Sequence, residues 1–124
     1  MKISFAICTH NEGYYIDDVL RRLTDFIVDS RPSGVEYEIV ILDDYSDDPT
    51  TKKLLNDYES RFSGILTIHQ RKFNRDYAEH KNHLNSLCTG DWIFNLDADE
   101  WISDEFLAFI PTLIDVNPDV EAYW

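Results

Sequence analysis

Residues 90–100 read Gly-Asp-Trp-Ile-Phe-Asn-Leu-Asp-Ala-Asp-Glu, an apolar run that ends abruptly in acidic side chains. The apolar part, residues 92–96, lacks strict alternation of apolar and polar positions, which is typical of strands covered on both faces in parallel sheets. Three more runs of this kind precede it, at residues 3–8, 38–42 and 65–69. Together the four runs predict the strands of a mostly parallel sheet.

Segments with helical periodicity separate these runs. Residues 15–29 repeat apolar side chains at helix spacing, and Asp48 followed by Pro49 is typical of an N-cap and a first helical position. Gly90 is expected to end a third helix, and Ser103 is expected to cap a fourth. The order β-α-β-α-β-α-β-α predicts an α/β fold of the doubly wound type, with helices on both faces of the sheet.

The chain of 124 residues has the length of a single domain, residues 1–124, and residues 120–124 predict the start of a further strand. It contains 11 basic and 24 acidic residues, a formal net charge of −13. This balance argues against nucleic acid and anionic membranes as partners. A small phosphorylated ligand stays compatible with it if a bound metal ion supplies local positive charge.

No apolar run is long enough for a membrane span or a signal peptide, so we expect a cytoplasmic protein. Cys8 and Cys88 have neither the number nor the spacing of a disulfide framework or a zinc cluster. We therefore expect two reduced, buried thiols.

Ligands of open α/β sheets bind beyond the carboxyl ends of the strands, so the segments that follow the predicted strands are the candidates for a site. These segments are residues 9–13, 43–48, 69–76 and 97–101. Three of them are acidic in character, and the one after the third strand is basic. A scaffold needs only turn-forming residues there, so this concentration of charge predicts a binding site.

Asp97 and Asp99 are separated by one residue, so in an extended segment both carboxylates point the same way. Two carboxylates can share one hard cation, with water and diphosphate oxygens completing its coordination. The metal would neutralise the diphosphate and stabilise it as a leaving group. An Asp-x-Asp triplet also arises by chance in so acidic a chain, but its place at the end of an apolar strand favours a metal site.

Asp43 and Asp44 follow the second predicted strand and have two interpretations. Acidic residues before a Ser-Asp-Asp-Pro turn can cap the turn and the following helix. Two consecutive aspartates at a strand end are better explained by binding, with Asp44 accepting a hydrogen bond from a base N–H or a ribose hydroxyl. His10 is left open between a loop residue without a role and a site residue.

Glu79, His80 and His83 share one face of the third predicted helix, a pattern that can bind zinc. No third ligand group with matching spacing accompanies them, so we expect a solvated helix face instead. Trp101, next to the acidic cluster, is left open between stacking on a ligand and packing in the core.

Four stretches together match a known pattern: Ile-Cys-Thr-His-Asn-Glu at residues 7–12, Ile-Val-Ile-Leu-Asp-Asp-Tyr-Ser-Asp-Asp at 39–48, Tyr-Ala-Glu-His-Lys-Asn-His-Leu-Asn at 77–85, and residues 90–100. In this order they resemble the nucleotide-binding half of inverting family 2 glycosyltransferases, which have the GT-A fold, and most of all the lipopolysaccharide-core and surface-glycan branch. The resemblance implies a Rossmann-like sheet of strand order 3-2-1-4, a UDP-sugar donor with UDP-glucose as the first guess, and Mn2+ or Mg2+ as the cofactor. It also implies a glycan or another hydroxyl compound as the acceptor.

The resemblance also implies roles for single residues. Thr9, His10 and Asn11 stand where the family's first loop meets the nucleotide, and Glu12 closes that loop. Lys81 stands where a basic residue approaches the base or the phosphates.

In the same way, the resemblance places Asp44 at the base and Asp43 in support of it. Asp97 would face the ribose and the metal, and Asp99 would be the main metal ligand. Ala98 lies between them in the same nucleotide-sugar-binding segment.

The chain departs from the family pattern in lacking the second half that binds the acceptor and supplies the catalytic base, so the catalytic residues stay unassigned. One interpretation is a minimal metal-dependent, inverting glycosyltransferase, completed by homo-oligomerisation or by another chain. A second is a module that binds UDP-sugar and metal with at most slow donor hydrolysis. A receiver-like signalling domain is disfavoured, because receivers carry their acidic pair after the first strand.

Overall fold

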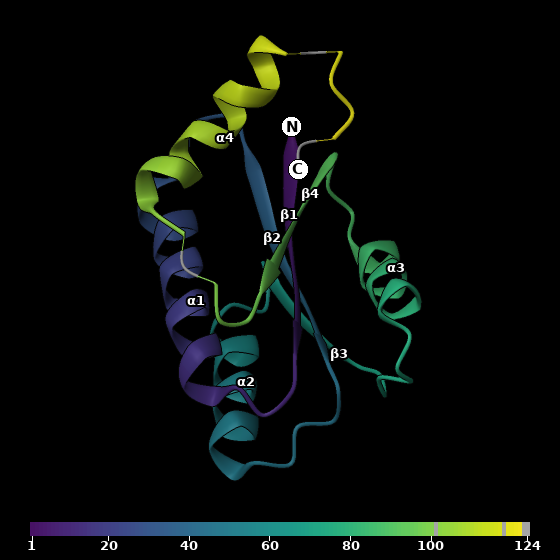
Figure 1. The fold of residues 1–124 in the computed structure, drawn as a ribbon. Coiled ribbons are helices and arrows are strands. Elements are labelled where there is room, and N and C mark those ends of the chain that lie inside the picture. The colour runs from purple at the N-terminus through teal and green to yellow at the C-terminus, as the bar shows by residue number, and fades with distance from the viewer. Residues whose placement is uncertain (101, 118, 123–124) are drawn as a thin grey trace.

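The computed structural model describes every residue except 101, 118, 123 and 124 (Figure 1). The described residues follow the predicted alternation of strands and helices. The strands are β1 (Lys2–Thr9), β2 (Glu36–Asp43), β3 (Leu66–Gln70) and β4 (Trp92–Asp97). The helices are α1 (Gly13–Asp25), the π-helical turn η1 (Phe26–Ser30), α2 (Pro49–Arg61), α3 (Tyr77–Leu87) and α4 (Asp104–Val116).

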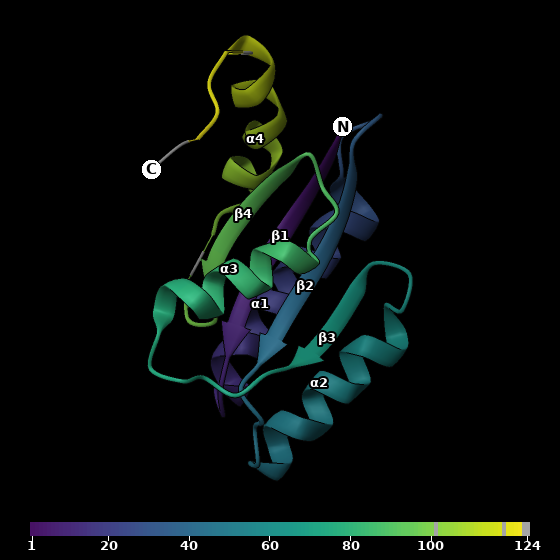
Figure 2. The ribbon, with the colours of Figure 1, turned by 90° about the vertical axis from the view of Figure 1, so that its right-hand side faces the viewer.

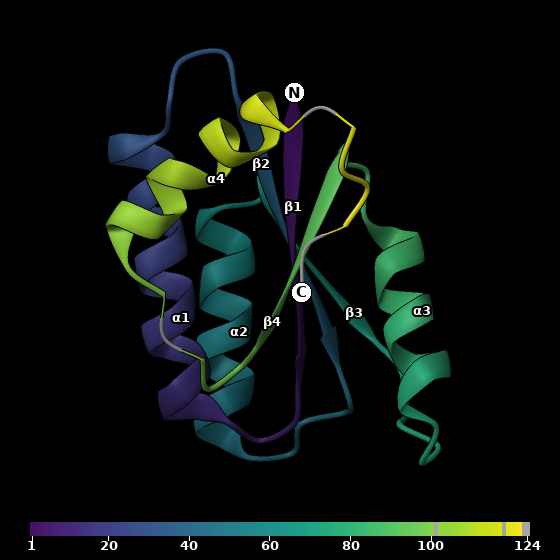
Figure 3. The same ribbon diagram turned by 45° about the horizontal axis from the view of Figure 1, so that its top comes forward.

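The sheet has the order β3-β2-β1-β4 with all neighbouring strands parallel, which confirms the predicted α/β fold and strand order. In register, Thr9 lies opposite Asp43, Cys8 opposite Asp97, and Asp43 opposite Gln70. The strands therefore end at one edge of the sheet, the lower edge in Figure 3. The chain order reverses between β1 and β4, which is where open α/β sheets bind ligands.

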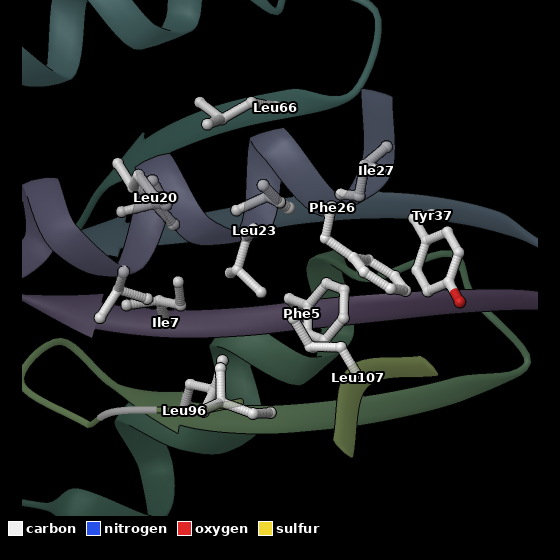
Figure 4. Packing of buried hydrophobic residues seen from close by; sticks show 14 of the residues in the cluster. Phe5, Ile7, Leu20, Leu23, Phe26, Ile27, Tyr37, Leu66, Leu96 and Leu107 are labelled. Carbon is white, nitrogen blue, oxygen red and sulfur yellow. The ribbon is translucent and has the colours of Figure 1, made fainter. Parts of the chain in front are cut away.

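Helices cover both faces of the sheet, with α1, α2 and α4 on one face and α3 on the other (Figures 1 and 2). The larger core lies on the side of α1. There Phe5 is fully buried and stacks on Tyr37 with ring centroids 5.8 Å apart, and Tyr37 packs edge-on against Phe26. Figure 4 shows these rings together with Leu20 and Leu23 of α1. This packing fixes the position of β1, the strand that leads into the site.

The smaller core lies under α3 and is formed by Ala6, Val40, Leu42 and Leu84. Cys8 and Cys88 are free thiols at its edge, and they are half-buried rather than buried as predicted, because this core is small. Burial raises the pKa of both thiols, that of Cys88 to about 11, so both stay protonated at neutral pH.

Three of the described helices begin at a capping side chain, and for two of them the sequence predicted the residue. Asp48 accepts a hydrogen bond from the Thr51 N–H at 3.0 Å, and Ser103 accepts one from the Phe106 N–H at 3.1 Å. Both caps were predicted, and each satisfies a helix N–H that would otherwise lack a partner.

Two predicted segments differ in the structure. The helix expected at 15–29 begins at Gly13 and passes into the π-helical turn η1. Residues 120–122 are not in a strand, and residues 123 and 124 lie outside the described residues, so the described part holds no fifth strand. Among the described residues, no helix combines the length and the apolar character needed to cross a bilayer.

Gly90 does not end α3 as predicted. The helix ends at Leu87, and Cys88 is already extended, with φ −80° and ψ 141°. A Cβ on Gly90 would lie 2.5 Å from Ser4 Oγ, 2.8 Å from Ser4 N and 3.0 Å from the Lys2 carbonyl oxygen. Glycine is needed there because the segment before β4 runs directly against the backbone of β1.

We expect Gly90→Ala to lower the free energy of unfolding by about 1–3 kcal/mol, the usual range for overpacking. The added methyl group would have to displace the backbone of β1, which is held on both sides by the sheet. Urea denaturation measures the difference. Gly64→Ala is the matched control, because a Cβ there meets nothing within 4 Å. Equal stability of the two variants would contradict the steric explanation.

Candidate functional site

A cavity of about 520 Å³ opens at the carboxyl ends of the strands, beside the first turns of α3. Its volume suits a small-molecule ligand, and it lies at the switch point between β1 and β4. The structure brings most of the predicted site residues together around it. They are Thr9, His10, Glu12, Asp44, Lys81, Asp97, Ala98 and Asp99.

Asn11, a further predicted site residue, does not line the cavity but joins the loops after β1 and β2. Its Oδ1 accepts hydrogen bonds from the N–H groups of Asp47 at 2.9 Å and Asp48 at 3.0 Å. Its Nδ2 donates to the Asp47 carboxylate at 2.7 Å, and its own N–H donates to Ser46 Oγ at 2.9 Å. Asn11 has φ 52°, a conformation that asparagine tolerates better than most residues.

Asp43 also lies behind the cavity wall rather than on it. The residue is 2% exposed, and its two carboxylate oxygens accept from the Ser46 hydroxyl at 2.6 Å and the Ser46 N–H at 3.1 Å. The turn closed in this way contains Asp44, which lines the cavity, and Tyr45, which has φ 43°. Asp43 therefore shapes the loop that presents Asp44.

Asp44 is half-buried and is held from two sides. Its Oδ1 accepts a hydrogen bond from the Phe73 N–H at 3.1 Å, and its Oδ2 lies 3.9 Å from His10 Nδ1. The Asp44 carbonyl oxygen accepts from His10 Nδ1, and Asn11 Nδ2 lies 3.3 Å from His10 Nε2. This pattern fits a His10 ring that donates from Nδ1 and accepts at Nε2. The Asp44 carboxylate thus keeps a fixed position with hydrogen-bonding capacity to spare.

Asp97 and Asp99 place exposed carboxylates on the cavity where β4 ends. Glu100 accepts a hydrogen bond from the Asp97 N–H at 2.8 Å, and its own N–H donates to the Asp97 carbonyl at 3.0 Å. This turn fixes the backbone of the triplet. Within the described residues, neither the Asp97 nor the Asp99 carboxylate has a hydrogen bond or an ion pair, so both are available to a ligand.

The described residues contain no cluster of three or more His, Cys, Asp or Glu side chains arranged to hold a metal ion. Asp97 and Asp99 are nevertheless suited to Mn2+ or Mg2+, which prefer oxygen ligands and commonly keep water and phosphate oxygens in their coordination shell. A cation would therefore be held jointly by these two carboxylates and by the ligand.

The charges around the cavity are consistent with a cation bound between the protein and an anionic ligand. Glu12, Asp44, Asp97 and Asp99 are the acidic residues of the cavity lining, and Lys81 of α3 is a basic one. A diphosphate would meet a predominantly negative surface in such a cavity. A bound cation would supply the missing positive charge.

Four further residues line the cavity: Cys8, Phe73, Tyr77 and His80. Phe73 lies in the segment 69–76 that was predicted to follow the third strand at the site, whereas the other three were not assigned to the site. The prediction that His80 lies on a solvated helix face is wrong, because the residue is only 6% exposed. His80 precedes the buried Leu84 by four residues, so both point to the same side of α3. That spacing was the signal that could have found it.

The rest of the suggested zinc pattern is not assembled. Glu79 is exposed and forms an ion pair with Arg71, and His83 is half-buried outside the cavity lining. Trp101, which was expected either to stack on a ligand or to pack in the core, lies outside the described residues.

A second cavity, of about 420 Å³, lies against the later turns of α1, η1 and the start of α4. Charged side chains of opposite sign pair within it, for example Arg21 with Asp18 at 2.7 Å and Arg22 with Asp104 at 3.6 Å. None of the loops that follow β1, β2 or β3 contributes to it. The strand-end cavity is therefore the better candidate for a ligand site.

Comparison with solved structures identifies close neighbours of the fold. The structure of residues 1–349 of S. aureus TarS in complex with UDP superposes with a TM-score of 0.76 and 26% identity, covering 95% of this chain and 33% of that TarS chain. A mannosyltransferase from Pyrobaculum calidifontis in complex with GDP-Man and Mn2+ gives a TM-score of 0.73 at 22% identity, covering 90% of this chain and 32% of that protein. At that identity the second likeness concerns the fold alone.

Comparison with known protein sequences also finds glycosyltransferases. N-acetylgalactosaminyltransferase 7 of Drosophila melanogaster is 29% identical over 97 residues, 78% of this chain and 16% of the relative. An uncharacterized glycosyltransferase of Mycoplasma genitalium, MG060, is 28% identical over 110 residues, 87% of this chain and 35% of the relative. The chain thus spans about a third or less of the length of these relatives. The sequence profile of Glycosyl transferase family 2 matches residues 4–121, and the chain belongs to this family.

Proposed function

We propose that this chain is the donor-binding part of a glycosyltransferase and that its strand-end cavity binds a UDP-sugar together with Mn2+ or Mg2+. The observation that carries the proposal is the convergence of Asp44, Lys81 and the triplet 97–99 on one cavity, at the switch point of a family 2 chain. The UDP complex of TarS, at 26% identity, supports a uridine nucleotide as the ligand.

Asp44 is the residue proposed to hold the base. One of its carboxylate oxygens is steadied by the Phe73 N–H, and its loop is tied down through Asp43 and Asn11. Uracil presents an N–H between two carbonyl oxygens, and an ionised carboxylate can only accept. A carboxylate in a fixed position is therefore well suited to that N–H.

Asp97 and Asp99 are proposed to hold the cation. When bound, the cation would neutralise the diphosphate and so make it a better leaving group. Glu100 keeps the backbone of the triplet in place through its bond to the Asp97 N–H. Lys81 would add positive charge from the side of α3.

In the proposed transfer, an acceptor hydroxyl oxygen forms a bond to the anomeric carbon of the sugar while the bond from that carbon to UDP breaks. The hydroxyl proton goes to a general base. Inversion at that carbon is what the family resemblance leads us to expect. No residue of this chain is assigned as the base, and Glu100 is already engaged with the backbone of Asp97. The role that we propose for this chain in the transfer is to bind and orient the donor.

Calorimetric titration of UDP-glucose, with and without Mn2+, tests the proposal. We expect binding that is at least about tenfold tighter with Mn2+, because the anionic ligand and the acidic cavity repel each other without it. Absence of binding under both conditions would contradict the proposal. Product analysis with a labelled donor then separates transfer to an acceptor from slow hydrolysis to free sugar.

A further inference from the structure

Two buried polar atoms of the cavity residues lack a hydrogen-bond partner within the described part of the chain: Thr9 Oγ1 and His80 Nδ1. Thr9 is 4% exposed and His80 is 6% exposed. Burying a polar atom without a partner is unfavourable, so nearly all such atoms in native proteins are paired. His80 is also part of the cavity wall, so a ligand that reaches its ring would provide the missing partner of Nδ1.

His80 lies in the part of the cavity proposed to hold the base. Its ring packs edge-on against Phe73, with centroids 5.4 Å apart, and Phe73 packs in the same way against Tyr77 at 4.9 Å. The backbone N–H of Phe73 is the group that holds the Asp44 carboxylate. His80, the aromatic pair and Asp44 therefore form one continuous wall.

The electrostatic surroundings keep this imidazole neutral. Burial lowers the pKa of His80, and the positive charge of Arg71 lowers it further, against the opposing effect of Asp44. A neutral imidazole can carry its proton on Nδ1 and donate from there. A carbonyl oxygen next to the N–H that Asp44 accepts would be the matching group on a uracil ring.

We propose that His80 is a specificity residue of the donor site, whose Nδ1 donates a hydrogen bond to a carbonyl oxygen of the uracil base held by Asp44. The inference rests on the proposed function of the cavity. The arrangement accepts uracil and rejects cytosine, whose ring offers an amino group and an unprotonated nitrogen at the corresponding positions.

The test compares His80→Leu, His80→Gln and wild type by titration with UDP, CDP and inorganic pyrophosphate, each with Mn2+. His80→Leu is expected to weaken UDP binding about 5- to 20-fold, the effect of one hydrogen bond in a buried site. The affinity of His80→Leu for pyrophosphate is expected to stay within about twofold of the wild-type value, because pyrophosphate has no base. His80→Gln, which keeps a donor, is expected to recover much of the preference for UDP over CDP.

Thermal denaturation separates this role from a structural one. Leucine at position 80 removes an unpaired polar atom, so His80→Leu is expected to be as stable as wild type or more stable, while UDP binding falls. His83→Leu, on the same helix but outside the cavity, is the matched control and is expected to bind UDP as wild type does. An equal loss of UDP and pyrophosphate binding, or no loss of either, would overturn the inference while leaving the donor site intact. Failure of wild type to bind UDP would overturn both.

Discussion

Phe5→Ala is expected to lower the free energy of unfolding by about 3–5 kcal/mol. Phe5 has no exposed surface, and its ring packs against Tyr37 at 5.8 Å and Phe94 at 5.9 Å. The substitution removes these contacts and leaves a cavity in the middle of β1 that the neighbouring strands cannot close. Urea denaturation followed by circular dichroism measures the loss.

The total stability of a domain is about 5–15 kcal/mol, so Phe5→Ala has the potential to unfold the chain. Phe5→Leu, which keeps most of the volume, provides a milder second measurement and is expected to lose less. Phe109→Ala is the matched control, because that ring is 47% exposed on α4. If Phe109→Ala lost as much stability as Phe5→Ala, the core would not be centred on β1.

Asp99→Asn is expected to weaken Mn2+-dependent binding of UDP by at least about 10- to 100-fold, since even changes outside the first coordination shell have effects of that size. The amide keeps the shape of the side chain and removes the charge that attracts the cation. Calorimetric titration of UDP with Mn2+ measures the effect. Folding is expected to be unchanged, because the Asp99 side chain is exposed.

Asp115→Asn controls for the loss of one negative charge, because Asp115 is an exposed residue of α4 outside the cavity lining. It is expected to bind UDP and Mn2+ as wild type does. Unchanged binding by Asp99→Asn would remove this residue from the metal site. Asp97 would then be left to hold the cation alone.

The strands and the helix caps could be predicted from the sequence because their causes are local. The four apolar runs became the four strands, and Asp48 and Ser103 accept the hydrogen bonds that a cap requires. The strand order came from the resemblance rather than from any local pattern. The sequence also placed Asp44 and the triplet 97–99 correctly at strand ends, since polar side chains stop each run.

The roles of Gly90, His80 and Asn11 were not predicted, because they depend on contacts between segments that are distant in the sequence. Gly90 resembled the glycine that ends a helix. The structure instead requires glycine there because the backbone of β1, some 86 residues away in the sequence, leaves no room for a Cβ. His80 looked solvated because α3 has few apolar residues to show which side faces the sheet. The role of Asn11 in joining two loops followed from hydrogen bonds that no spacing in the sequence reveals. Asp43, by contrast, accepts hydrogen bonds from Ser46 three residues further on, which is the local turn that the sequence offered as one of two interpretations.

The bonds of Asn11 also bear on conformational entropy. Because its side chain and N–H connect the loops after β1 and β2, both loops are ordered before any ligand arrives. The entropy lost in ordering them opposes folding rather than binding, so a ligand meets a preorganised site. Heat tolerance and ligand affinity are therefore linked through these two loops. A change that loosens one of them weakens both properties together.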